Sequence, residues 1–256
     1  METPAIEFID VSKRFGESSY NAVDSVSLSI EKGEFITILG SSGCGKTTLL
    51  KIINRLYEPS EGSVRLLGQD ISDLDPVKLR RGIGYVIQQI GLFPHMTIRE
   101  NIATVPKLLK WDKNRIDNRV KELLSLVGME PEEFIDRYPS QLSGGQQQRI
   151  GLIRALAVDP EVMLLDEPFG AIDAITRLNL QDELTRIHGG LKKTFVFVTH
   201  DINEAFKLGD RVIVMDQGKV LQFDTPKRIV TDPADGFVAS LIASAREQEQ
   251  FWEAVK

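Results

Sequence analysis

The stretch that decides the fold of this chain is Phe35–Ile36–Thr37–Ile38–Leu39–Gly40–Ser41–Ser42–Gly43–Cys44–Gly45–Lys46–Thr47. Its first part is a continuous apolar run, which is typical of a strand buried on both faces. The glycines let consecutive backbone N–H groups converge on phosphate oxygens, and the start of a helix adds its positive dipole end. The alternative is a glycine-rich turn before an ordinary helix, but the order of strand, loop and helix favours a phosphate site.

The end of this loop carries the residues that recognise a nucleoside triphosphate. Lys46 can reach the β- and γ-phosphates, and the hydroxyl of Thr47 can bind Mg²⁺. The sequence therefore predicts a set of nucleotide contacts at Gly40, Ser41, Ser42, Gly43, Cys44, Gly45, Lys46, Thr47 and Thr48.

Cys44 is the only cysteine of the chain, so no internal disulfide can form. Because the beginning of a helix lowers the pKa of a nearby thiol, we expect a lowered pKa at Cys44. Alkylation of this thiol should then inactivate the protein, and bound nucleotide should protect it. The alternative is a small residue that is tolerated in the loop.

Two further apolar strands end in polar residues. Val162–Leu165 runs into Asp166 and Glu167, and a later strand ends before His200. Open α/β sheets bind ligands at such carboxyl ends. Asp166 suits Mg²⁺, Glu167 suits the orientation or deprotonation of a water, and His200 can donate a hydrogen bond to a γ-phosphate. Carboxylates that cap a helix, and a surface histidine that caps the next helix, are the alternatives.

A second anion site is predicted at Leu142–Ser143–Gly144–Gly145–Gln146. Ser143 and Gln146 have the spacing of a capping box, and the two glycines leave the first N–H groups of a helix unobstructed. One γ-phosphate needs only one such site in a subunit, so the second favours sharing between two subunits. The alternative is a well-capped helix after a flexible linker.

Composition restricts the class of protein. The chain has 256 residues, 42% hydrophobic and 27% charged, and a net charge of −6, which disfavours a strongly basic nucleic-acid binder. The start has no secretion-signal pattern, and no apolar run approaches the roughly 18 residues of a membrane span. We expect a cytosolic protein whose role at a membrane comes through a partner.

The remaining pattern predicts an α/β fold. Strand-like segments surround a region with helical spacing from about residue 98 to 158, where Val120, Leu123, Leu124 and Val127 share one face. Val212–Phe223 reads as a late hairpin, and helical spacing returns after Thr225. The middle region therefore looks like a helical insertion into an α/β sheet.

Taken together, these motifs resemble the ATPase subunit of an ATP-binding cassette (ABC) transporter over about Ile6 to Phe223. The resemblance implies a P-loop NTPase (RecA-like) core with an antiparallel β subdomain and an inserted helical subdomain. We place the core in 1–89 and 159–224, the helical subdomain in 90–158 and a helical tail in 225–256. The implied ligands are ATP and Mg²⁺.

In this family two cassettes form a head-to-tail dimer, so the resemblance implies that each site borrows residues from a second copy. The borrowed residues would be Ser143, Gly144, Gly145, Gln146 and Asp173.

The resemblance also assigns two residues that no motif above covers. Phe15 would stack on adenine, and Gln88 would join Thr47 and Asp166 around Mg²⁺ and act in catalysis with Glu167 and His200. Spacing alone leaves Gln89 as an alternative to Gln88.

A finer resemblance, carried by Tyr85–His95 and Asn101–Pro106, is to importers of glycine betaine, carnitine and choline. It implies an ATP-hydrolysing import subunit at the cytoplasmic face of the membrane. Its partners would be transmembrane permease subunits and, indirectly, a substrate-binding protein, with no nucleic acid. The alternatives are a soluble ABC ATPase acting on DNA or ribosomes, an exporter or lipoprotein-release ATPase, and a nucleotide sensor that does not hydrolyse ATP.

Overall fold

The computed structural model describes residues 3–16, 19–170 and 172–254, so the ends of the predicted outer ranges, 1–2 and 255–256, lie outside it. Two compact units account for the chain. The first combines residues 1–74 with 196–256, and the second is residues 75–195. This grouping differs from the predicted ranges, because β7 (Val162–Asp166) and α8 (Ala174–Leu191) fall within the same unit as the helices that precede them. The predicted domain boundaries stay a prediction.

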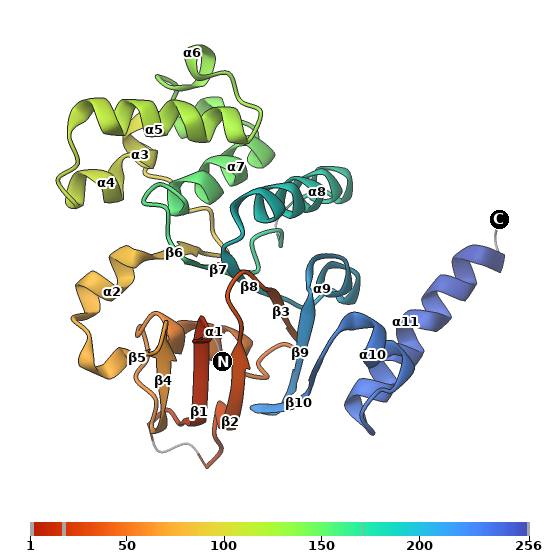
Figure 1. Cartoon of the computed structure of the whole chain (residues 1–256). Helices are drawn as coiled ribbons and strands as arrows, with labels where there is room; N and C mark the ends of the chain where they lie inside the picture. Colours follow the sequence, from red (N-terminus) through yellow and green to blue (C-terminus); the bar gives the residue numbers. More distant parts are fainter. Residues whose placement is uncertain (1–2, 17–18, 171, 255–256) are drawn as a thin grey trace. The chain divides into compact units, whose positions relative to one another are not determined.

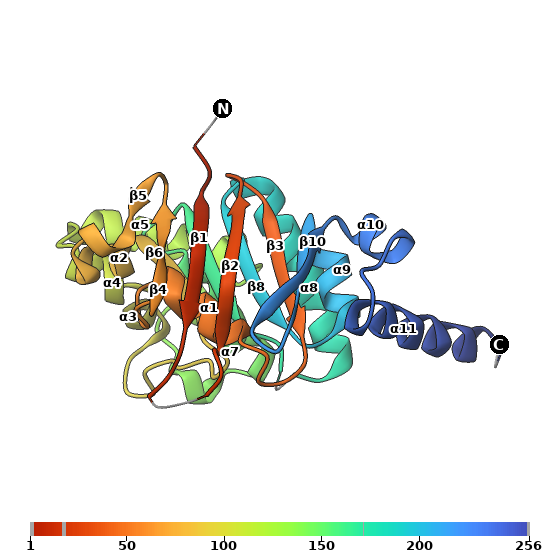
Figure 2. The same cartoon turned by 90° about the horizontal axis from the view of Figure 1, so that it is seen from below.

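An antiparallel sheet in the first unit confirms the predicted β subdomain. Its strand order is β2-β1-β4-β5, and β1 and β2 lie side by side in both views (Figures 1 and 2). The pairing of β1 with its two neighbours contains register shifts, which mark β-bulges. The strands are β1 (Ile6–Lys13), β2 (Val23–Ile30), β4 (Glu61–Leu66) and β5 (Gln69–Asp70).

The strands that position the phosphate loop also lie in the first unit, as consecutive neighbours β10-β9-β3-β8. All six residues of β3 are buried, as its apolar sequence predicts. β3 and β9 are parallel, and β9 pairs with β10 as the predicted hairpin. The elements are β3 (Phe35–Gly40), α1 (Lys46–Ile53), the 3₁₀ turn η1 (Ile71–Asp73), β8 (Thr194–Thr199, which begins in the second unit), α9 (Ile202–Leu208), β9 (Arg211–Asp216) and β10 (Lys219–Asp224).

The last helices pack on this sheet. They are α10 (Pro226–Thr231) and α11 (Phe237–Ala254). Ile229, Val238 and Ile242 are buried in one apolar cluster with Leu39 of β3 and Val214 of β9. The first part of the predicted tail therefore contributes to the core beneath the strand that carries the phosphate loop.

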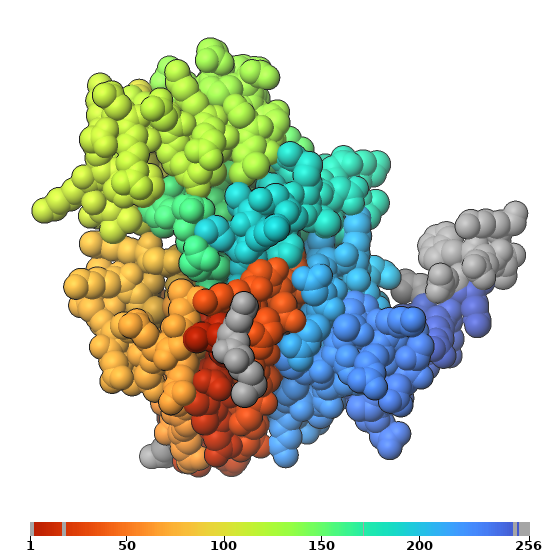
Figure 3. Space-filling model, viewed as in Figure 1, coloured from red at the N-terminus to blue at the C-terminus, as the bar shows by residue number. Residues whose placement is uncertain are grey.

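The second unit combines two parallel strands with the predicted helical region, which is yellow-green in Figure 3. The predicted helix face is confirmed, because Val120, Leu123, Leu124 and Val127 are all buried. The elements are α2 (Pro76–Gly82), β6 (Ile83–Val86), α3 (Ile98–Ile102), α4 (Thr104–Leu108), α5 (Lys113–Leu126), α6 (Pro131–Phe134), η2 (Pro139–Gln141), α7 (Gly144–Ala155), β7 (Val162–Asp166) and α8 (Ala174–Leu191).

None of the helices in the described ranges is both long and apolar enough to cross a bilayer.

The packing around Gly40 yields a stability prediction. A Cβ added there would collide with the carbonyl oxygen of Met215 and lie 2.7 Å from the Cys44 sulfur. We expect Gly40→Ala to lower the free energy of unfolding by about 1–3 kcal/mol, as overpacking does. Gly189→Ala is the matched control, because Gly189 lies inside α8 with open space around it and alanine favours a helix. Urea unfolding followed by circular dichroism measures both; equal midpoints for the two variants would contradict the predicted clash.

Candidate nucleotide site

The loop between β3 and α1 needs its glycines for two different reasons. Gly43 and Gly45 have φ of +78° and +107°, a region that residues with a Cβ rarely adopt. Gly45 also faces the carbonyl oxygen of Ala22, which a Cβ would strike. Gly40 has no positive φ, so the expectation that its backbone conformation requires glycine is wrong. It is restricted by space instead, because the backbone of Met215 lies against it.

Lys46 folds back into this loop. Its side chain is only 4% exposed, and Nζ donates hydrogen bonds of 2.9 Å to the carbonyl oxygens of Gly40 and Ser41. A buried ammonium is costly unless polar partners surround it, and carbonyl oxygens only partly replace water. The loop therefore holds a concentrated positive charge close to its own backbone N–H groups, which is an arrangement suited to an anion.

The loop is anchored to the β9–β10 hairpin by contacts that the sequence does not predict. The hydroxyl of Ser41 donates a 3.0 Å hydrogen bond to Asp216, and the backbone N–H of Gly218 donates one of 3.0 Å to the carbonyl of Cys44. From the sequence alone, Asp216 and Gly218 are only residues near the turn of the predicted hairpin. No local pattern could reveal that this turn supports a loop 175 residues earlier.

The expected low pKa of the Cys44 thiol is wrong. Cys44 is 4% exposed, and this burial raises the pKa of its thiol. The positive charge of Lys46 and a backbone hydrogen bond act in the opposite direction but do not outweigh the loss of solvation. The thiol is therefore protonated at neutral pH, which favours the alternative of a small residue that is tolerated in the loop.

The paired carboxylates of the second unit lie at the end of β7, as predicted: Asp166 is its last residue and Glu167 follows it. Asp166 is 7% exposed, and the hydroxyl of Tyr85 lies 3.4 Å from its Oδ2. Glu167 has φ of +45°, a left-handed conformation that is unfavourable for a residue with a Cβ. Gln88 donates a 3.4 Å hydrogen bond from Nε2 to Glu167 Oε2, so this glutamine reaches the carboxylate pair.

The capping box predicted for α7 is confirmed. Ser143 accepts a 3.3 Å hydrogen bond from the backbone N–H of Gln146, whose side chain accepts a 2.9 Å bond from the N–H of Ser143. The side of Gly144 is open, because nothing lies within 4 Å of an added Cβ. Gly144 is also exposed, so the first turn of α7 is open to solvent on this side, and the start of a helix attracts anions.

The beginning of α8 lies beside the beginning of α7. A Cβ on Gly145 would lie 2.7 Å from Cγ2 of Thr176. Asp173 caps α8 by accepting a 3.0 Å hydrogen bond from the N–H of Thr176, and this contact lowers the pKa of the Asp173 carboxyl. The structure thus places the start of α8, which Asp173 caps, beside the Ser143–Gln146 segment, although the two were predicted from separate motifs.

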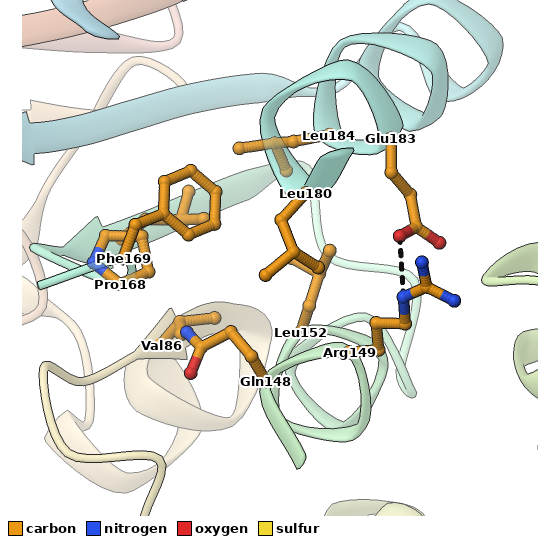
Figure 4. Close-up of a pocket in the computed structure, with 10 residues that line it drawn as sticks. Val86, Gln148, Arg149, Leu152, Pro168, Phe169, Leu180, Glu183 and Leu184 are labelled. Atoms are coloured by element: carbon orange, nitrogen blue, oxygen red, sulfur yellow. Dashed lines mark ion pairs between the residues drawn. The ribbon is translucent and has the colours of Figure 1, made fainter. Parts of the chain in front are cut away.

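An ion pair joins the two helices further along. Arg149 of α7 lies 2.9 Å from Glu183 of α8 (Figure 4). Burial raises the pKa of the Glu183 carboxyl, and the positive charge of Arg149 acts in the opposite direction. Leu152, Leu180 and Leu184 are among the side chains around the adjoining cavity. With a volume of about 10 Å³, this cavity is too small for a nucleotide. The ion pair and the leucines around it therefore connect α7 to α8.

Two predicted residues occupy exposed positions in the first unit. His200 directly follows β8, and Asp201, rather than the histidine, caps α9. Phe15 follows β1 and is 42% exposed. The first unit thus carries the phosphate loop, Phe15 and His200, whereas Gln88 and the paired carboxylates belong to the second.

Known proteins are similar to this chain in sequence. The ABC transporter family matches residues 23–170. The carnitine transport ATP-binding protein OpuCA of Listeria monocytogenes is 55% identical over 94% of this chain and 60% of its own length. The glycine betaine uptake system ATP-binding protein YehX of Escherichia coli is 52% identical over 91% of this chain and 75% of its own. The chain therefore spans less than two thirds of the Listeria protein.

A solved structure agrees in fold. The ATP-binding cassette MJ0796, in a dimeric post-hydrolysis state bound to ADP and Pi, matches with a TM-score of 0.75 and 38% identity. The match covers 86% of this chain and 98% of that one. The predicted P-loop fold and the resemblance drawn from the motifs are both confirmed, and the chain belongs to the ABC transporter family.

Proposed function

We propose that this chain is the ATP-hydrolysing subunit of an ABC importer for quaternary-amine osmoprotectants. The observation that carries the proposal is sequence identity. More than half of the aligned residues are identical to those of relatives named for the transport of carnitine and the uptake of glycine betaine. The residues of the phosphate loop, the carboxylate pair and the Ser-Gly-Gly segment provide the chemistry that such a subunit needs.

ATP would be held mainly by the loop between β3 and α1. The backbone N–H groups of residues 40–48 would surround the phosphates, Lys46 would leave its carbonyl partners for the β- and γ-phosphates, and Phe15 would stack on adenine. The half-exposed ring of Phe15 and the concentrated positive charge at Lys46 support these roles.

The proposed Mg²⁺ ligands are Thr47, Gln88 and Asp166, an all-oxygen donor set of the kind that Mg²⁺ prefers. Among the described residues, no group of three or more His, Cys, Asp or Glu side chains gathers to form a protein-only metal site. Such a site is unnecessary, because Mg²⁺ is usually bound by one or two carboxylates and the phosphates of its nucleotide. When bound, the ion would neutralise charge on the phosphates.

Hydrolysis would use Glu167, Gln88 and His200. Glu167 would orient the attacking water and accept its proton, Gln88 would hold the Glu167 carboxylate through its amide, and His200 would donate a hydrogen bond to the γ-phosphate. The hydrogen bond between Gln88 and Glu167 supports the first two roles.

A second copy of the chain would complete each site with Ser143, Gly144, Gly145, Gln146 and Asp173. The accessible first turn of α7 supports this role, because its N–H groups and dipole attract a γ-phosphate. ATP would favour the closed dimer, and loss of the γ-phosphate would remove this contact and reopen it. The MJ0796 cassette, whose solved structure is dimeric, is an example of a cassette that pairs with a second copy.

The dimer would act at the cytoplasmic face of the membrane on transmembrane permease subunits, and a substrate-binding protein would act indirectly. Reconstitution of the chain with its permease and binding protein in liposomes tests this role. We expect ATPase activity to rise with betaine, carnitine or choline and not with unrelated solutes. Failure of every quaternary amine to stimulate hydrolysis would remove the cargo proposal and leave the ATPase proposal intact.

Glu167→Gln separates binding from hydrolysis. Loss of a general base slows catalysis by about 10²–10⁴-fold, whereas the amide can keep the hydrogen-bonding geometry. We expect this variant to form a stable dimer with MgATP, measured by sedimentation velocity. The double variant Glu167→Gln/Gly144→Leu is the matched control. The leucine side chain fits the open space at Gly144 but covers the start of α7, so this variant should stay monomeric. An ATP-loaded monomer of Glu167→Gln itself would contradict the shared site.

Labelling of Cys44 by N-ethylmaleimide tests the nucleotide position in the loop. Because burial raises the thiol pKa, we expect labelling at neutral pH about tenfold or more slower than in the urea-unfolded chain, and acceleration at alkaline pH. MgATP should slow the native reaction further. Equal rates with and without MgATP at alkaline pH would argue against nucleotide bound over this loop.

A further inference from the structure

We propose that Tyr57 is a positioning residue that holds the ring of Phe15 for adenine. The inference rests on the proposed role of Phe15 and extends it to a residue that no motif marks. The two rings lie edge to face, with centroids 5.1 Å apart and planes at 79°. This is a favourable arrangement for aromatic pairs, because the positive edge of one ring meets the negative face of the other.

Phe15 needs such a partner. It stands in a loop after β1 and is 42% exposed, so little packing restricts its side chain. The ammonium of Lys13 lies 5.2 Å from its ring centroid, which is a cation–π contact. A lysine is flexible and can move aside for a base, whereas the rigid ring of Tyr57 limits the directions in which Phe15 can turn.

Hydrogen bonds also join the segment before Phe15 to the segment after Tyr57. The backbone N–H of Arg14 donates a 3.1 Å hydrogen bond to the hydroxyl of Ser60, which lies 3.4 Å from the carbonyl of Arg14. The N–H of Ser60 donates a 2.8 Å hydrogen bond to the carbonyl of Ser12. The segment from Tyr57 to Ser60 therefore contacts both the backbone just before Phe15 and the ring of Phe15.

Tyr57 is in turn tied to α1. Its N–H donates a 3.2 Å hydrogen bond to the carbonyl of Lys51, and the ammonium of Lys51 lies 5.5 Å from its ring centroid. Helix α1 begins at Lys46, so the helix that follows the phosphate loop also fixes the aromatic ring proposed for adenine. Tyr57 thus connects recognition of the two ends of the nucleotide.

The test compares ATP with inorganic tripolyphosphate, which lacks a base. We expect Tyr57→Ala to weaken ATP binding about two- to tenfold in calorimetry, with tripolyphosphate affinity unchanged. Tyr57→Phe should restore ATP affinity, because it keeps the ring. In a Phe15→Ala background, Tyr57→Ala should cause no further loss. The control is Leu56→Ala, a half-exposed neighbour whose truncation should leave both affinities unchanged.

Three results would overturn the inference. ATP affinity could stay unchanged in Tyr57→Ala while Phe15→Ala weakens it, which refutes the positioning role alone. Tyr57→Ala could weaken ATP and tripolyphosphate equally, which indicates general damage to α1. If Phe15→Ala leaves ATP affinity unchanged, the proposed adenine contact itself fails, and the role of Tyr57 fails with it.

Discussion

The close approach of the loop after β3 to the β9–β10 hairpin is the constraint on which the candidate site depends. No side chain fits between Gly40 and Met215, and hydrogen bonds from Ser41 and Gly218 close the contact. These contacts hold the loop against the sheet. Because it is fixed, Lys46 can be held against loop carbonyls at a definite place, and α1 begins in a definite direction. The hairpin, far along the chain, thereby acts as the support of the phosphate loop.

Local features of the site could be predicted from the sequence, because they depend on neighbouring residues. The buried character of β3 follows from its apolar run, and the start of α7 follows from the spacing of Ser143 and Gln146. The convergence of Asp173 on the start of α7 required the fold, since their motifs are separated in sequence. The same holds for the contact of Gln88 with Glu167, whose residues are 79 positions apart.

Cys44 shows why a sound local rule can fail. A helix start does favour a thiolate, and the rule from sequence describes that effect correctly. Burial is a property of the whole fold, however, and at this position it outweighs the local field. Gly40 is a similar case, because a conformational explanation suits Gly43 and Gly45 but the shortage of space at Gly40 comes from a distant strand.

The left-handed backbone of Glu167 bears on how this chain can change over evolution. Such a conformation costs roughly 1–2 kcal/mol for a residue with a Cβ, and glycine would be free of that penalty. Selection for thermal stability alone would therefore favour glycine in place of this glutamate, and the carboxylate would be lost. Retention of glutamate is a compromise in which the fold gives up some stability to keep an acidic oxygen beside Gln88. Variants selected for heat resistance alone should accordingly tend to lose this carboxylate.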